Sequence, residues 1–416
     1  MPMGSPFAGL IAMIETWRWF GPRDVTTIAD VMQTGAKGIV SALHHVPDGA
    51  VWTLQEIGGR QEQVRRTADG RASGLEWVVV ESLPVSEDIK RQTGEWREHL
   101  ANYRQSLENL AAAGIETVCY NFMPVIDWTR TQLAWQVPHG GYCMRFDAVD
   151  FAVFDIHLLK RRGARDDVPL EVAEAAEQRH REMGEAEKTA LVASVLAGLP
   201  GAADVLSLDT VQHHLDKYGE IDAKRLRGHL FAFLEEVVPT AERLGLRLCC
   251  HPDDPPLPLM GLPRIMSTEA DYMAMLDHIP SPANGMTLCS GALGARPDND
   301  LPGIMRRLGH RVHFIHLRNV KLQGDKVGSS FYECEHLEGS VDMAALVEAI
   351  VDEERRRKAE GRPDHSIPMR PDHGQDILDD IGRGAQPGYP LIGRLKGLAE
   401  LRGLFRATER LKSVLA

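Results

Sequence analysis

Short apolar runs alternate with amphipathic helical stretches along most of this chain, and that alternation restricts it to very few folds. Eight runs have the length and composition of buried strands, at residues 13–19, 38–43, 75–82, 116–122, 246–250, 286–289, 312–317 and 367–371. Strands separated by helices pair in parallel, so the pattern predicts an α/β fold, first of all a (β/α)8 TIM barrel. An open doubly wound sheet is the alternative.

Residues 123 to about 220 interrupt the alternation. Residues 171–197 form a highly charged helical stretch, which predicts a helical insertion after the fourth strand. An insertion that follows a strand end is placed where a lid over a site would lie. We interpret residues 13–416 as a single catalytic barrel domain. Residues 1–12 are weakly apolar without the basic region of a signal peptide, which indicates a leader or tag-like tail.

Composition excludes several classes of function. The formal net charge of −12 is spread along the chain without a basic stripe, which argues against a nucleic-acid partner. No apolar run reaches 18 residues, so the sequence predicts no membrane partner. The six cysteines are too few and too scattered for a disulfide framework, and a reducing cytoplasm suits them best.

Four strands in the second half of the chain each end in a residue that can bind a metal: His251, Cys289, His316 and Asp372. In parallel sheets and barrels, chemistry gathers at the carboxyl ends of the strands, so one such residue per strand end predicts a convergent site. A single histidine or cysteine at a strand end is more often a packing residue. Four strand ends of the same construction favour a metal cluster.

The softness of these four ligands bears on the choice of metal. Two imidazoles, a thiolate and a carboxylate form a competent set of borderline softness, which by itself favours zinc, with iron second and manganese unusual. Alternation along a strand places His251 on the face of Cys249, and His316 on the face of Phe314. The absence of a Cys-x-x-Cys ribbon favours a catalytic over a structural site.

Two further residues could move protons near this cluster. His373 follows Asp372 directly, so it should point away from the ligand position and is available as an acid or base. Tyr389 lies in a loop after the last strand, where its phenol could overhang the site. The competing interpretations are a hydrogen-bonding role beside the metal for His373 and a surface loop position for Tyr389.

Three arginines could bind an anionic substrate. Arg18 ends the first strand between two tryptophans, and Arg130 lies at the start of the insertion. Arg318 shares its strand face with His316, which makes it the strongest single expectation for positive charge near the metal.

Together these stretches closely resemble the mannonate dehydratase family. The resemblance rests on ordered motifs such as Glu15-Thr-Trp-Arg-Trp-Phe-Gly-Pro22, His251-Pro-Asp-Asp-Pro-Pro256 and Met369-Arg-Pro-Asp-His-Gly374. Further matching stretches lie at residues 42–45, 118–125, 127–130, 261–264, 316–319 and 393–400. The likeness extends from about residue 13 to 405.

The resemblance implies a xylose-isomerase-like barrel that holds one Mn²⁺ or Fe²⁺ and dehydrates D-mannonate to 2-dehydro-3-deoxy-D-gluconate in hexuronate catabolism. It places the metal ligands on His251, Cys289, His316 and Asp372, and the acid and base on His373 and Tyr389. This overrides the softness argument for zinc. A sugar acid is then the expected small-molecule partner, and we expect a homo-oligomer, a dimer or higher.

Three alternatives remain open at this point. A metal-dependent sugar isomerase or epimerase of the same fold would hold its metal with several carboxylates, and the fourth strand ends in Asn121-Phe122 without one. A non-catalytic binding relative is disfavoured because all six proposed site residues occur together. A metal nuclease is disfavoured by the acidic charge balance.

Overall fold

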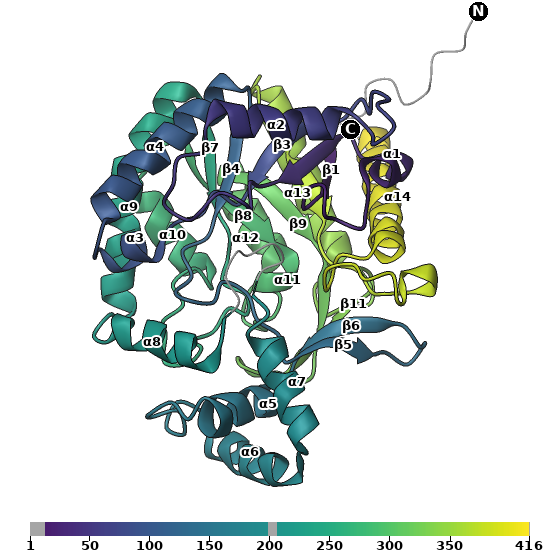
Figure 1. Cartoon of the computed structure of the whole chain (residues 1–416). Coiled ribbons are helices and arrows are strands. Elements are labelled where there is room, and N and C mark those ends of the chain that lie inside the picture. The colour runs from purple at the N-terminus through teal and green to yellow at the C-terminus, as the bar shows by residue number, and fades with distance from the viewer. Residues whose placement is uncertain (1–12, 199–205, 416) are drawn as a thin grey trace, which may run out of the picture.

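Eight parallel strands close into a barrel in this computed structural model, which describes residues 13–198 and 206–415 (Figure 1). The order around the barrel is β1-β12-β9-β8-β7-β4-β3-β2. The barrel strands are β1 Ile14–Arg18, β2 Gly38–Ser41, β3 Glu76–Glu81, β4 Thr117–Tyr120, β7 Arg247–Cys250, β8 Asn284–Cys289, β9 Val312–Leu317 and β12 Pro368–Pro371. The predicted TIM barrel is confirmed, since the pairing of Ile14 with Pro368 joins the first and last strands.

Helices surround the barrel on its outer side (Figure 1). They are α1 Ile28–Thr34, α2 Leu54–Arg65, α3 Glu87–Arg91, α4 Trp96–Ala112, α9 Ala223–Leu244, α10 Glu269–His278, α12 Leu301–Leu308, α13 Met343–Ala359 and α14 Leu391–Leu415. The short, buried α11 Ser290–Leu293 instead follows directly from the carboxyl end of β8. Local signals fix several ends. Thr268 caps α10 through a capping box with Asp271, and Gly245 ends α9 in the left-handed conformation that glycine adopts most easily.

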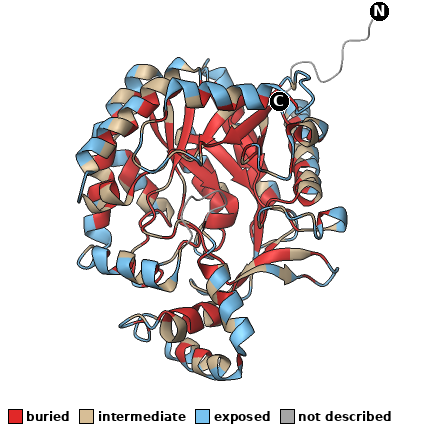
Figure 2. Cartoon of the chain, viewed as in Figure 1, coloured by how far each residue is buried: buried red, intermediate tan, exposed pale blue. Residues whose placement is uncertain are grey.

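The barrel strands are buried on both faces, as the red centre of Figure 2 shows. Most buried apolar side chains form one large cluster. A separate small cluster consists of Val40, Val79, Cys119, Cys249 and Phe314, drawn from five barrel strands. Side chains from so many strands meet only inside the barrel, so this cluster marks the inward face of each strand.

The insertion after β4 contains a β-hairpin as well as the expected helices. Its described elements are β5 Gln132–Gln136, β6 Tyr142–Phe146, α5 Ala148–Val153, the π-helix η1 Phe154–Leu158, α6 Leu170–Glu182, α7 Glu185–Val195 and α8 Leu208–Tyr218. Helix α7 and all but the first residue of α6 lie within residues 171–197, the stretch that the sequence predicts as helical. The hairpin was not predicted.

A second hairpin, also not predicted, follows β9. Its strands are β10 Asn319–Leu322 and β11 Phe331–Cys334. The two hairpins join into one antiparallel sheet of order β10-β11-β6-β5, with Phe331 opposite Phe146. The insertion after β4 and the hairpin after β9 are therefore joined by strand pairing beside the mouth of the barrel (Figure 1).

Two predictions concern the ends of the chain and the membrane. The expected leader or tag-like tail, residues 1–12, lies outside the described residues. Among the described residues, none of the helices combines the length and the apolar character that a membrane crossing requires.

Candidate functional site

The predicted ligands stand on four neighbouring strands of the barrel. His251 follows β7, Cys289 ends β8, His316 lies on β9 and Asp372 follows β12, and these strands are consecutive in the barrel order. The inward cluster contains Cys249 and Phe314, each two residues before a histidine of the set, so both imidazoles point to the inward side.

Three of the four offer ligand atoms around one point. A nitrogen of His251, the sulfur of Cys289 and a nitrogen of His316 all lie within 4.8 Å of one another. His251 Nε2 is 3.2 Å from His316 Nδ1, and the other ring nitrogen of His316, Nε2, lies buried 3.4 Å from a carboxylate oxygen of Glu81. Two imidazoles in contact with each other beside a thiol suit a divalent transition-metal ion. These residues therefore fit a metal.

Asp372 lies beside this group. Its Oδ2 atom is 3.6 Å from the sulfur of Cys289. The carboxylate also pairs with Arg370 and, at 2.8 Å, with Nε of Arg318. Burial alone would raise the pKa of Asp372, but Arg370, His373 and Arg318 outweigh burial and hold that pKa well below its usual value. The carboxylate is therefore ionised, as a metal ligand must be.

His373 and Tyr389 both line a cavity at the carboxyl ends of the strands. Their rings meet edge to face with centroids 5.0 Å apart, and the Trp128 ring lies edge to face with the imidazole at a centroid distance of 6.4 Å. Tyr389 is only 5% exposed, so it is not a surface loop residue. Burial raises the pKa of Tyr389 to about 12. Its phenol therefore keeps its proton at neutral pH.

A glycine makes room for this pair. Gly388 has a φ of +79°, and a Cβ atom there would lie 3.1 Å from Cγ of His373 and 2.3 Å from Cε of Met144. A larger residue would push the loop that carries Tyr389 away from the imidazole.

The three predicted arginines lie in two different environments. Arg18 lines the cavity, and its Nε and Nη1 atoms are buried without a hydrogen-bond partner. Arg130 and Arg318 are fully buried outside the cavity lining and both pair with Asp254 and Glu333. Arg18 is thus the predicted arginine that lines the cavity, where its Nη1 atom lies 4.0 Å from a carboxylate oxygen of Glu81.

Sequence reasoning missed three acidic residues of this site. Glu81, at the end of β3, accepts two hydrogen bonds from Arg370 and lies 3.4 Å from Nε2 of His316. Its position at the end of an apolar strand could have identified Glu81 from the sequence. Asp254 follows His251 by three residues and could have been found as well. Glu333 lies on the unpredicted strand β11, so nothing in the alternation pointed to it.

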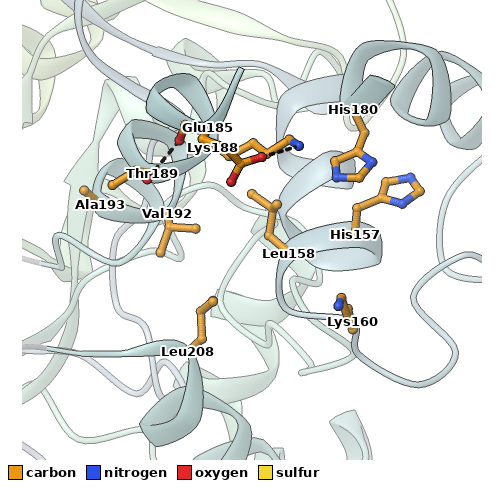
Figure 3. Close-up of a pocket in the computed structure, with 10 residues that line it drawn as sticks. All are labelled: His157, Leu158, Lys160, His180, Glu185, Lys188, Thr189, Val192, Ala193 and Leu208. Carbon is orange, nitrogen blue, oxygen red and sulfur yellow. Dashed lines mark hydrogen bonds and ion pairs between the residues drawn. The ribbon is translucent and has the colours of Figure 1, made fainter. Parts of the chain in front are cut away.

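The cavity lining shows which part of the insertion reaches the site. The lining residues are Arg18, Phe20, Glu81, Ser82, Asn121, Met123, Asp127, Trp128, His251, Asp254, Arg370, Asp372, His373 and Tyr389. Only the first residues of the insertion, such as Asp127 and Trp128, are among them. A second pocket lies within the insertion, between η1, α6, α7 and the start of α8 (Figure 3), and contains none of the predicted site residues.

Comparison with known proteins agrees with this geometry. The family model described as D-mannonate dehydratase (UxuA) matches residues 13–414. The chain belongs to the D-mannonate dehydratase family. The mannonate dehydratase of Rhizobium meliloti is 58% identical over 395 residues, covering 95% of this chain and 97% of that protein. Mannonate dehydratase 1 of Agrobacterium fabrum is 57% identical, with 95% and 96% coverage.

Solved structures show the same relationship. The crystal structure of mannonate dehydratase from Streptococcus suis superposes with a TM-score of 0.73 at 30% identity, covering 96% of this chain and 95% of that one. A xylose isomerase-like TIM barrel protein from Mycobacterium smegmatis, solved with magnesium, reaches a TM-score of 0.50 at 11% identity and 97% and 98% coverage. The second likeness concerns the fold alone, and it agrees with the expected xylose-isomerase-like barrel.

Proposed function

We propose that this chain dehydrates D-mannonate to 2-dehydro-3-deoxy-D-gluconate and water with one bound Mn²⁺ or Fe²⁺. The observation that carries the proposal is the full-length family match. It is supported by a cavity lined by His251, Asp372, His373 and Tyr389, beside the group of His251, Cys289 and His316 that could hold a metal ion. Such a site suits a hydro-lyase, which removes a proton and a hydroxyl group from neighbouring carbons.

His251, Cys289 and His316 would hold the metal ion, with Asp372 as the fourth ligand. When bound, such an ion supplies Lewis-acid stabilisation of the negative charge that develops as the proton on C2 of a sugar acid is removed. Mn²⁺ and Fe²⁺ are proposed on the family resemblance, since ligand softness alone favours zinc.

His373 and Tyr389 would transfer the two protons. One group must remove the proton from C2, and another must protonate the hydroxyl on C3, because hydroxide is a poor leaving group. Both groups line the cavity, with ring centroids 5.0 Å apart, so an imidazole lies beside a protonated phenol. The enol that results tautomerises to the 2-keto-3-deoxy acid.

Arg18 would bind the carboxylate of the substrate. Two of its donors, Nε and Nη1, make no hydrogen bond within the protein, and a carboxylate accepts charge-assisted hydrogen bonds from a guanidinium at the cavity wall. Arg130 and Arg318 would not contact the substrate. Their ion pairs would instead fix the positions of Asp254 and Glu333.

Three further properties stay predictions. The lid function of the insertion would fall to its first residues, such as Asp127 and Trp128, which line the cavity. The homo-oligomeric state and the cytoplasmic location are expected from the family resemblance and from cysteine usage.

An assay on a panel of aldonic acids tests the proposal. The protein is stripped of metal, reconstituted separately with Mn²⁺ and Fe²⁺, and incubated with D-mannonate and its epimers while 2-keto-3-deoxy acid is measured. D-Mannonate should give the highest kcat/KM, and the stripped protein serves as the matched control. Formation of an epimer without loss of water would support the isomerase or epimerase alternative, and binding without turnover would support a non-catalytic relative.

A further inference from the structure

The imidazole of His373 is hydrogen-bonded to the carboxylate of Glu333, a residue outside the barrel strands. Nδ1 of His373 lies 2.9 Å from Oε1 and 2.7 Å from Oε2 of Glu333. Glu333 is 3% exposed and stands on β11, in the hairpin that follows β9. The orientation of His373, the proposed proton-transfer residue, therefore depends on the hairpin that follows β9.

Glu333 is itself fixed by two buried arginines. Nη2 of Arg130 donates to Oε1 at 2.9 Å, and Nη1 of Arg318 donates to the same oxygen. Burial alone would raise the pKa of Glu333, but the charge of Arg318, the hydrogen bond from His373 and the charge of Arg130 outweigh burial and lower it. An ionised carboxylate only accepts hydrogen bonds, so the nitrogen that faces it must donate.

This hydrogen bond determines where the lone pair of a neutral His373 lies. With its proton on Nδ1, the ring carries its lone pair on Nε2. Nε2 is 3.6 Å from Oδ1 of Asp372, beyond hydrogen-bond distance, and Tyr389 and Trp128 contact the ring edge to face. The free nitrogen belongs to a ring that lines the cavity.

We propose that Glu333 is a positioning residue that keeps neutral His373 protonated on Nδ1, so that His373 is the base and Tyr389 the acid of the dehydration. The inference rests on the proposed function. The C2–H bond breaks, its proton goes to Nε2, and its electron pair forms the C2–C3 double bond as the C3–O bond breaks. The phenol of Tyr389 gives its proton to the departing oxygen, which leaves as water. Return of the proton from His373 to Tyr389 completes the cycle.

Glu333→Gln keeps the shape of the side chain and replaces one hydrogen-bond acceptor by a donor. The oxygen position that receives Arg130 and Arg318 must stay an acceptor, so the amide nitrogen has to occupy the Oε2 position, 2.7 Å from Nδ1. The amide then donates to Nδ1 and moves the imidazole proton to Nε2. In serine proteases, replacing the triad aspartate by asparagine likewise leaves the geometry intact but gives the catalytic histidine the wrong tautomer, and activity is lost.

The test is ¹⁵N NMR of the histidine rings in protein loaded with a diamagnetic divalent ion, at pH 8, with His373 assigned by its loss in His373→Ala. In wild-type protein we expect a proton on Nδ1 and a lone pair on Nε2, and in Glu333→Gln the reverse. A lone pair on Nδ1 in the wild type, or a doubly protonated ring, would overturn the proposal. The wild-type measurement decides the matter even if the variant does not fold.

Kinetics supply the second readout. Glu333→Gln should lower kcat by about 10²–10⁴-fold, the range of general acid–base catalysis, while KM for D-mannonate stays near the wild-type value. Asp254→Asn is the matched control, because it removes a charge from the same arginines without contacting Nδ1 of His373, and its tautomer should remain that of the wild type. An unchanged kcat in folded Glu333→Gln would contradict the proposal. Failure of the wild type to turn over D-mannonate would instead contradict the proposed function, and the tautomer remains measurable.

Discussion

Nε2 of His251 lies 3.2 Å from Nδ1 of His316, although the two residues are 65 positions apart in the chain. They come from β7 and β9, and the strand between these two ends in Cys289. Two imidazoles and a thiol that converge inside a barrel form a site whose natural occupant is a cation. The large apolar core does not include these residues, so the fold should survive the loss of the metal.

Chelation should abolish turnover while leaving the barrel folded. Added Mn²⁺ or Fe²⁺ should restore activity, and at 100 times its Kd the ion should stabilise the protein by about 2.7 kcal/mol. Activity assays, far-UV circular dichroism and thermal melts of stripped and reloaded protein check this. Full activity in protein that elemental analysis shows to be metal-free would contradict it.

Cys289→Ser should weaken zinc inhibition more than manganese activation. A thiolate favours softer ions, and zinc, with its four-coordinate preference, would be saturated by the four protein ligands. Manganese and ferrous iron accept additional oxygen ligands. Inhibition and activation curves for the variant and the parent measure the effect, with Cys143→Ser, on β6, as the control. Equal zinc sensitivity in Cys289→Ser and the parent would remove Cys289 from the ligand set.

Tyr389→Phe should lower kcat by about 10²–10⁴-fold with its metal content unchanged. The pKa of Tyr389 is raised to about 12, so the phenol remains a proton donor throughout the neutral range. A loss of activity at alkaline pH below about 10 should therefore not come from ionisation of Tyr389. Steady-state kinetics with parallel metal analysis checks both points, and near-normal kcat would exclude Tyr389 as the acid.

Arg18→Leu should raise KM for D-mannonate far more than it lowers kcat. A hydrogen bond to a charged group contributes about 1.5–3 kcal/mol, which corresponds to roughly 10- to 150-fold in affinity. Arg23→Leu is the matched control, because Arg23 is exposed a few residues further along the chain. Equal KM values for the two variants would show that Arg18 does not bind the carboxylate.

Glu354→Gln should make stability less dependent on pH. Burial raises the pKa of Glu354, on α13, to about 8, well above the ordinary glutamate value of about 4.3. The folded protein therefore keeps a proton that the unfolded chain releases, and the stabilisation is complete below about pH 4 and lost as pH rises to about 8. Thermal melts from pH 5 to 8.5 should show Tm of the parent falling relative to that of the variant, and parallel curves would contradict the prediction.

Much of the site could be predicted because residues that can bind a metal recur at one structural position, the end of a barrel strand. His251, Cys289, His316 and Asp372 each follow an apolar run directly, and the closure of the barrel brings such positions together regardless of their spacing in the chain. The strand periodicity also placed His251 on the face of Cys249 and His316 on the face of Phe314, and the small inward cluster shows that these faces point into the barrel.

The two hairpins could not be predicted in the same way. Their strands are four or five residues long and mix charged with apolar residues, as in Tyr142–Phe146 and Phe331–Cys334. Each is stabilised by pairing with a segment almost 190 residues away, which a local pattern does not encode. Glu333 was missed for this reason, and Arg130 and Arg318 were expected at the substrate because their acidic partners were unknown.

The pairing of β1 with β12 gives this protein a particular problem during synthesis. Ile14 leaves the ribosome about 350 residues before its neighbour Pro368 exists. At ~5–20 residues per second, that edge of the first strand waits roughly 20 to 70 s for its partner. An unpaired strand edge can pair with another chain and start aggregation. During most of its synthesis, the nascent chain therefore has one edge of β1 without its hydrogen-bonding partner β12. Chaperone supply during translation should therefore govern the yield of this protein more than the stability of the finished barrel.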